Sequence, residues 1–152
     1  MLTARMSDLV SRCRSAGLSV TPQRMAIYGA LVESEDHPSP EMLYSRVRAQ
    51  MPSLSLATIY KGLDTLVELG LVREVAAMSG IKRYDANLEQ HHHLVCTQCG
   101  KIIDFYDRKL DAVAPTRRSH KLVGFIPETV SVQVMGACAR CARTPRRAGK
   151  SG

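Results

Sequence analysis

The chain of 152 residues lacks the segments that mark a membrane-spanning or secreted protein. No stretch approaches the roughly 20 consecutive apolar residues that are needed to cross a bilayer. The first ten residues, MLTARMSDLV, are interrupted by Arg5 and Asp8, so they do not resemble the apolar region of a signal peptide. We therefore expect a cytoplasmic protein with no membrane association. Thiols stay reduced in that compartment, where paired cysteines are more often metal ligands than disulfides.

The chain also lacks tryptophan, is low in other aromatic residues, and contains neither an HExxH nor an HxE motif. Zinc hydrolases and deaminases need such a motif and an open coordination position on the metal. We therefore predict that the protein is not an enzyme. A zinc-stapled enzyme or adaptor protein is the alternative class.

Four of the five cysteines form two CxxC pairs. Cys96 and Cys99 form the first pair, and Cys138 and Cys141 follow about 40 residues later. This arrangement strongly indicates a structural tetrahedral zinc site, because each pair supplies two thiolates and four ligands close the coordination sphere. The fifth cysteine, Cys13, lies on the apolar stripe of a predicted helix, and we expect it to be a buried free thiol.

Three consecutive histidines at 91–93 immediately precede the first cysteine pair. Side chains alternate between the two faces of a strand, so His91 and His93 should project together while His92 shares the opposite face with Cys96. We therefore predict that His91 and His93 serve a different metal from the one that the cysteines hold. A closed zinc site beside a histidine-rich site suggests a metal sensor.

The net charge of +7 makes a nucleic-acid partner plausible, but its distribution does not locate the contact surface. Residues 1–84 hold ten basic and eight acidic residues, whereas residues 85–152 hold eleven and six. Five of the eleven lie between Arg140 and Lys150, in a tail that we expect to be disordered.

Residues 1–84 are predicted to form short helices followed by a β-hairpin. An apolar stripe with helical spacing predicts a first helix that ends before Gly17. Each of Thr21, Ser39 and Ser55 is typical of the N-cap of a further helix. The last of these helices is predicted to end at Gly70. The segments LVREVA and IKRYDA, separated by Met78, Ser79 and Gly80, alternate like the strands of a hairpin. The side chains expected to face the core are Met6, Leu9, Val10 and Cys13, then Leu43, Val47 and Met51, then Ile59, Leu63, Leu66 and Val67. Helices followed by a hairpin outline a winged helix.

In a winged helix, the helix that begins at Ser55 would enter the major groove of DNA. The Thr58 and Tyr60 hydroxyls could donate hydrogen bonds to bases, and Lys61 could neutralise a phosphate. Arg24 could reach the DNA backbone from the side, and Ser55 at the start of the helix is a further candidate for DNA contact. The simpler interpretation is that any amphipathic helix has a polar face.

The motifs together resemble the ferric uptake regulator family over roughly residues 5–142. The segments that carry the resemblance are TPQR at 21–24, SLATIYKGLDTLVELGLV at 55–72, RYDAN at 83–87, HHHLVCTQCGKIIDF at 91–105 and CARC at 138–141. The resemblance implies an α+β protein, with a winged-helix DNA-binding domain at 1–84, an α/β dimerisation and metal-binding domain at 85–142, and a basic tail at 143–152. It implies a homodimeric repressor that binds a palindromic DNA operator, with structural zinc on the four paired cysteines.

The resemblance also implies a regulatory metal site that joins the two domains. The residues that match the ligand positions of the family are His37, Asp85, His91, His93 and Asp104. Three imidazoles and two carboxylates suit Fe(II) or Mn(II), although zinc remains open. A metal clamp of this kind would act by favouring the DNA-competent arrangement of the dimer.

The two carboxylate ligands, Asp85 and Asp104, indicate which signal the protein detects. The peroxide-responsive branch of the family has Asp where iron-responsive members have Glu, and this chain has Asp at both 85 and 104. The resemblance therefore favours a peroxide sensor in which iron oxidises a histidine ligand. An iron-, manganese- or zinc-responsive uptake regulator without peroxide sensing is the alternative. An additional metal site on the opposite face has His92, Asp111 and His120 as its candidates.

Overall fold

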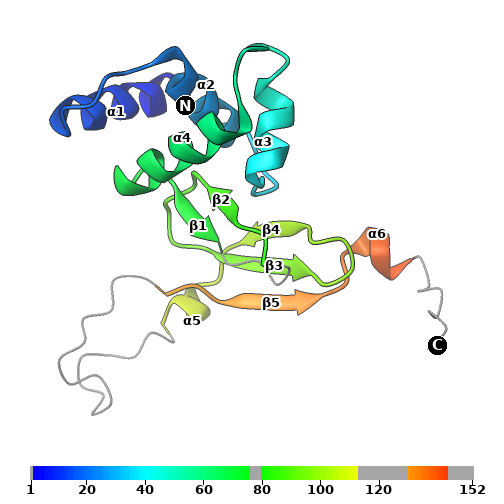
Figure 1. The fold of residues 1–152 in the computed structure, drawn as a ribbon. Helices are drawn as coiled ribbons and strands as arrows, with labels where there is room; N and C mark the ends of the chain where they lie inside the picture. Colours follow the sequence, from blue (N-terminus) through cyan, green and yellow to red (C-terminus); the bar gives the residue numbers. More distant parts are fainter. Residues whose placement is uncertain (1, 76–79, 113–129, 144–152) are drawn as a thin grey trace. The chain divides into compact units, whose positions relative to one another are not determined.

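The computed structural model describes residues 2–75, 80–112 and 130–143, and it divides into two compact units (Figure 1). The units are Met1–Leu88 and Glu89–Gly152, and each is described by itself. The domain boundary predicted at residue 84 falls inside the first unit, so Asp85 belongs with the helices and the hairpin. Among the described residues, no helix is long and apolar enough to cross a membrane. His120, Met78, Ser79 and all of the tail beyond Arg143 lie outside the described residues.

The described residues of the first unit form four helices followed by a two-stranded hairpin, which is the winged-helix order predicted from the sequence. The elements are α1 (Leu2–Ser15), α2 (Pro22–Val32), α3 (Pro40–Val47), α4 (Leu56–Glu68), β1 (Arg73–Val75) and β2 (Arg83–Asp85). The two strands are antiparallel, with Arg73 opposite Asp85 and Val75 opposite Arg83. Both strands are shorter than the segments predicted for them.

The predicted N-caps are confirmed at all three positions. The side-chain oxygen of Thr21 accepts from the Arg24 backbone N–H at 3.2 Å. Likewise, Ser39 accepts from the N–H of Met42 at 3.3 Å, and Ser55 accepts from that of Thr58 at 3.1 Å. Each bond satisfies an N–H group that has no partner within its helix. α4 ends where Gly70 adopts a φ of 65°, a left-handed conformation that favours glycine.

The core of the first unit lies where α1, α2, α3 and α4 meet, and most of the predicted core residues are buried there. Met6, Val10 and Met51 are only partly buried. Met51 lies beyond the end of α3 at Val47, and it packs against the core from there. One expectation was wrong. Val67 is 37% exposed, because it lies at the edge of the helix stripe whose centre is Ile59, Leu63 and Leu66.

In the part of the second unit that the structure describes, three strands form one sheet with the order β4-β3-β5. Its elements are β3 (His92–Cys96), β4 (Ile102–Phe105), α5 (Arg108–Asp111), β5 (Gln133–Gly136) and α6 (Ala139–Ala142). β3 pairs antiparallel with β4 and parallel with β5. The register places Asp104 opposite His93 and Gly136 opposite Cys96. The sheet therefore sets up two sites, one at each end of β3.

Candidate metal centres and nucleic-acid interface

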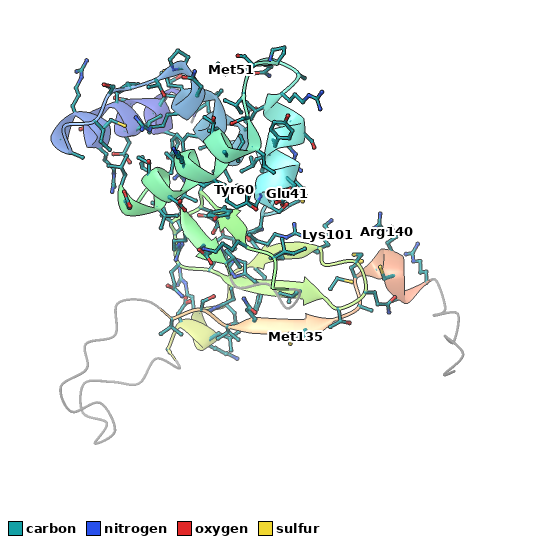
Figure 2. All side chains as sticks on the ribbon, in the orientation of Figure 1. Glu41, Met51, Tyr60, Lys101, Met135 and Arg140 are labelled. Atoms are coloured by element: carbon teal, nitrogen blue, oxygen red, sulfur yellow. The ribbon has the colours of Figure 1, made fainter. Side chains whose placement is uncertain are left out.

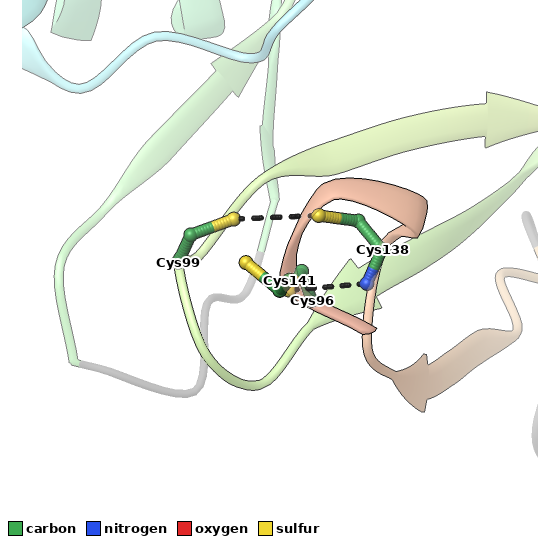
Figure 3. A group of neighbouring side chains, drawn as sticks. All are labelled: Cys96, Cys99, Cys138 and Cys141. Atoms are coloured by element: carbon green, nitrogen blue, oxygen red, sulfur yellow. Dashed lines mark hydrogen bonds between the residues drawn. The ribbon is translucent and has the colours of Figure 1, made fainter. Parts of the chain in front are cut away.

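The four paired cysteines converge at the C-terminal end of β3 (Figure 3). Their sulfur atoms all lie within 4.8 Å of one another, and the Sγ atoms of Cys99 and Cys138 are 3.8 Å apart. A tetrahedral zinc ion with Zn–S bonds of about 2.3 Å would place its sulfur ligands about 3.8 Å apart. The cluster therefore has the composition and the spacing of a structural zinc site.

Hydrogen bonds within the cluster shift the pKa values of Cys96 and Cys141 in opposite directions. The Cys138 backbone N–H donates to the Cys96 sulfur at 3.3 Å, and this bond, with those from Cys99 and Gln98, lowers the pKa of Cys96 to about 6. Hydrogen bonds with Cys138 and Cys99 raise the pKa of Cys141 to about 12. Deprotonation is therefore favoured at Cys96 and opposed at Cys141. Zinc would have to displace the Cys141 proton on binding.

The second donor cluster lies at the other end of β3 and contains only nitrogen and oxygen ligands. The Nε2 atoms of His91 and His93 are 3.0 Å apart, and they lie 3.6 and 3.7 Å from Oδ1 of Asp104. Nδ1 of His91 lies 2.8 Å from the Glu89 carbonyl oxygen, which accepts a hydrogen bond from it and leaves Nε2 as the metal-binding nitrogen. The strand alternation predicted for the histidine run is confirmed, since His92 faces the other way.

Two further ligand candidates lie together in the first unit. Nε2 of His37 is 3.9 Å from Oδ1 of Asp85, and both side chains are buried. His37 has a φ of 48°, which is uncommon for a residue other than glycine. Strand β2 holds it there: the Arg83 guanidinium donates to the His37 carbonyl at 3.1 Å, and the Tyr84 N–H donates to the next carbonyl, that of Pro38, at 3.2 Å. The sequence did not identify Arg83, because 46 residues separate it from His37.

His92 is fully buried on the opposite side of β3 from the other two histidines. Its Nε2 lies 3.1 Å from Oδ1 of Asp111, and its Nδ1 accepts from the Val132 N–H at 3.3 Å. Two of the three residues named for an extra metal site are therefore adjacent. The third, His120, lies outside the described residues. A histidine–carboxylate pair of this kind also stabilises a fold without metal.

Four of the predicted DNA-binding residues lie at the start or in the first half of α4, and the fifth, Arg24, lies in α2. Lys61 is exposed, and Ser55 and Thr58 hydroxyls lie 2.8 Å apart, so one of them donates to the other. Arg24 donates to the Ser19 carbonyl oxygen. The Tyr60 hydroxyl donates to Oε1 of Glu41 at 2.7 Å, so in this structure its proton is bonded within the protein. Glu41 carried no signal in the sequence, because it lies in another helix.

Comparison with known proteins places these features in context. A profile described as the ferric uptake regulator family matches residues 15–134. The peroxide-responsive repressor PerR of Staphylococcus epidermidis is 32% identical over 136 residues, which cover 90% of this chain and 89% of that protein. The crystal structure of a peroxide stress regulator from Campylobacter jejuni is 34% identical, with a TM-score of 0.67 and coverage of 90% and 98%. The ferric uptake regulator of Helicobacter pylori has the same fold, with a TM-score of 0.76 at 24% identity and coverage of 93% and 94%.

Proposed function

The chain belongs to the ferric uptake regulator family, and we propose that it is a repressor that detects hydrogen peroxide through iron-catalysed oxidation of a histidine ligand. Membership makes it a metal-responsive DNA-binding regulator and not an enzyme. Beyond family membership, we propose that the signal is hydrogen peroxide and that the regulatory metal is iron. We also propose that the protein acts as a homodimer on a palindromic operator.

The observation that carries the proposal is the separation of two kinds of donor in the second unit. All four sulfur ligands lie at one end of β3, while His91, His93 and Asp104 bring only nitrogen and oxygen donors together at the other. Thiolates favour zinc, whereas imidazole and carboxylate ligands suit Fe(II) or Mn(II). We assign structural zinc to the cysteines and the regulatory metal to the second cluster.

We propose that His37 and Asp85 complete the regulatory site. They bring an imidazole and a carboxylate together in the first unit. His91, His93 and Asp104 bring the same kinds of ligand together in the second unit. Five ligands drawn from both units would couple metal binding to the arrangement of the DNA-binding unit. The metal would then act through its higher affinity for the arrangement that binds DNA.

The peroxide response follows from the donor set. Iron at this site would supply the one-electron chemistry that activates peroxide. His37 and His91 are the imidazoles that we expect to be oxidised, and Asp85 and Asp104 contribute no oxidisable group. The addition of one oxygen atom to an imidazole would remove a ligand and weaken DNA binding. The similarity to peroxide-responsive repressors and to a peroxide stress regulator supports this assignment.

We propose that a second copy of the chain covers the exposed apolar face of the sheet in the second unit. Leu94, Ile103 and Val134 are 38%, 38% and 46% exposed, and they are direct cross-strand neighbours on β3, β4 and β5. A contiguous apolar patch of this kind favours burial against another protein surface. A symmetric dimer would present two copies of α4 to two DNA half-sites, and the operator would then be palindromic.

The test is DNA binding by the zinc-loaded protein with Fe(II), Mn(II) or Zn(II), each before and after addition of hydrogen peroxide. The proposal predicts metal-dependent binding, with release by peroxide only in the iron sample. Metal-dependent binding that peroxide does not alter would instead indicate an uptake regulator that responds to iron, manganese or zinc. Binding that needs no regulatory metal would refute both.

A further inference from the structure

The hydroxyl of Tyr60, on the exposed side of α4, is bound to a carboxylate from α3. It donates to Oε1 of Glu41 at 2.7 Å, across 19 residues of sequence, and Figure 2 shows the two side chains next to each other. Tyr60 is 38% exposed. A tyrosine that points into solvent normally keeps its hydroxyl for water or for a ligand, so this bond restricts what the side chain can offer to DNA.

Glu41 is itself held in place by the N-cap of its helix. The Ser39 hydroxyl donates to Oε2 of Glu41 at 2.8 Å, while the Ser39 oxygen accepts from the Met42 N–H at 3.3 Å. Ser39 is buried, with 6% of its surface exposed. The backbone at the start of α3 therefore fixes Ser39, Ser39 fixes one carboxylate oxygen, and the other carboxylate oxygen fixes Tyr60.

The charge state of the pair sets the direction of the hydrogen bond. The bond from Tyr60 is the main cause that lowers the pKa of Glu41, and the same bond raises the pKa of Tyr60. Glu41 thus stays ionised and only accepts, while Tyr60 stays protonated and donates to it. What Tyr60 can still present to DNA is the ring and the lone pairs of its oxygen. An unpaired tyrosine would also present a mobile O–H donor.

We propose that Glu41 is a specificity-determining residue of the DNA-binding surface, acting by positioning Tyr60 and taking up its hydroxyl proton. The inference rests on the proposed role of α4 as the recognition helix. The inference gives Glu41 two opposite effects on DNA binding. Its negative charge near DNA lowers the affinity for every sequence, whereas its hydrogen bond to Tyr60 favours the correct sequence. The residue would weaken binding in general and improve discrimination between the correct sequence and other sequences.

The experiment measures two affinities for each variant of the full-length, zinc- and Mn(II)-loaded protein. One probe is the duplex that the wild-type protein selects from a random 30-base-pair library, and the other is a scrambled duplex of the same composition. The variants are Glu41→Ala, Glu41→Gln, Tyr60→Phe and the double variant Glu41→Ala/Tyr60→Phe. Glu68→Ala is the matched control, since it removes an exposed carboxylate from α4 itself.

Glu41→Ala should lower the ratio of selected to scrambled affinity about five- to tenfold, the effect of losing one positioned hydrogen bond. Tyr60→Phe should lower it by a similar factor, and the double variant should show no further loss, because both changes remove the same interaction. Glu41→Gln should retain most of the ratio, since its amide oxygen can still accept from Tyr60. Glu68→Ala should raise both affinities equally and leave the ratio unchanged.

Three results would overturn the inference: an unchanged ratio in Glu41→Ala, losses that add in the double variant, or the same loss in Glu68→Ala. Thermal unfolding of each variant shows whether it is folded. If Glu41→Ala is misfolded, the affinity ratios of Glu41→Gln and Tyr60→Phe test the role of Glu41. Lys61→Ala separates this inference from the proposed function. If it leaves DNA binding intact, α4 is not the recognition helix; if it weakens binding while Glu41→Ala keeps the ratio, only the role of Glu41 is wrong.

Discussion

The guanidinium of Arg83 donates a hydrogen bond to the carbonyl oxygen of His37 at 3.1 Å and holds that histidine at a φ of 48°. A left-handed conformation at a residue with a side chain costs free energy of about 1 kcal/mol or more unless neighbouring groups stabilise it. Arg83 lies in β2, two residues before Asp85, which is the other ligand candidate of this unit. One strand therefore supplies a carboxylate and also orients the imidazole beside it.

Arg83→Ala should lower the affinity for Mn(II) by about tenfold, the usual effect of losing a group that orients a ligand. The physical reason is that His37 would then sample other backbone conformations before metal binds. Calorimetric titration with Mn(II) measures the change. Lys82→Ala is the control, because it removes a neighbouring cation whose ion pair with Glu74 is exposed. Equal affinities in the two variants would show that Arg83 does not orient the ligand.

Cys138→Ser should lose the structural zinc and much of the dimer. Zinc binding contributes directly to the folding free energy of a small domain, and Cys138 supplies one of the four clustered sulfur atoms. Zinc content by atomic absorption and mass by light scattering measure the two effects. Cys13→Ala should keep zinc and the dimer, and it should lower the free energy of unfolding by about 1 kcal/mol because the thiol is fully buried. A Cys138→Ser protein that remains folded and dimeric without zinc would contradict the assignment.

Lys61→Ala should weaken binding to all DNA sequences alike, and it should reduce the dependence of log affinity on log salt concentration by about one ion. The exposed ammonium group on α4 would neutralise one phosphate and release one counterion. Fluorescence anisotropy at several salt concentrations gives the slope. Lys101→Ala, in the second unit, should leave the slope unchanged. A sequence-dependent loss in Lys61→Ala would instead indicate a contact with a base.

Asp104→Glu should keep metal-dependent DNA binding but reduce the response to peroxide. The longer side chain can bind the metal through both oxygens and close the position at which peroxide would react. Asp111→Glu is the matched control, since Asp111 lies beside His92 and not beside the regulatory cluster. DNA release on addition of Fe(II) and peroxide measures the response in each protein.

In the unmodified chain, Fe(II) with peroxide should add one oxygen atom to a peptide that contains His37 or His91, and Mn(II) should protect both peptides. Mass spectrometry of proteolytic fragments identifies the oxidised residue. Release of DNA with unmodified histidines and oxidised cysteines at 96, 99, 138 or 141 would mean that the zinc site responds to peroxide instead.

The local features of this chain were determined by the sequence alone, because they depend on neighbouring residues. The N-caps at Thr21, Ser39 and Ser55 are set by side chains that bond to an N–H three residues ahead. The alternation of His91, His92 and His93 follows from the geometry of an extended strand. The paired CxxC spacing identified the four cysteines that cluster at the end of β3, since each pair is itself a local unit.

What only the tertiary structure decided are the contacts between segments far apart in the chain. The register of β3 against β4 places Asp104 opposite His93, and the bond from Arg83 sets the backbone of His37. The hydrogen bond from Tyr60 to Glu41 joins α4 to α3 across 19 residues of sequence. No local pattern encodes such contacts, because they depend on how helices and strands pack, and packing is a property of the whole unit.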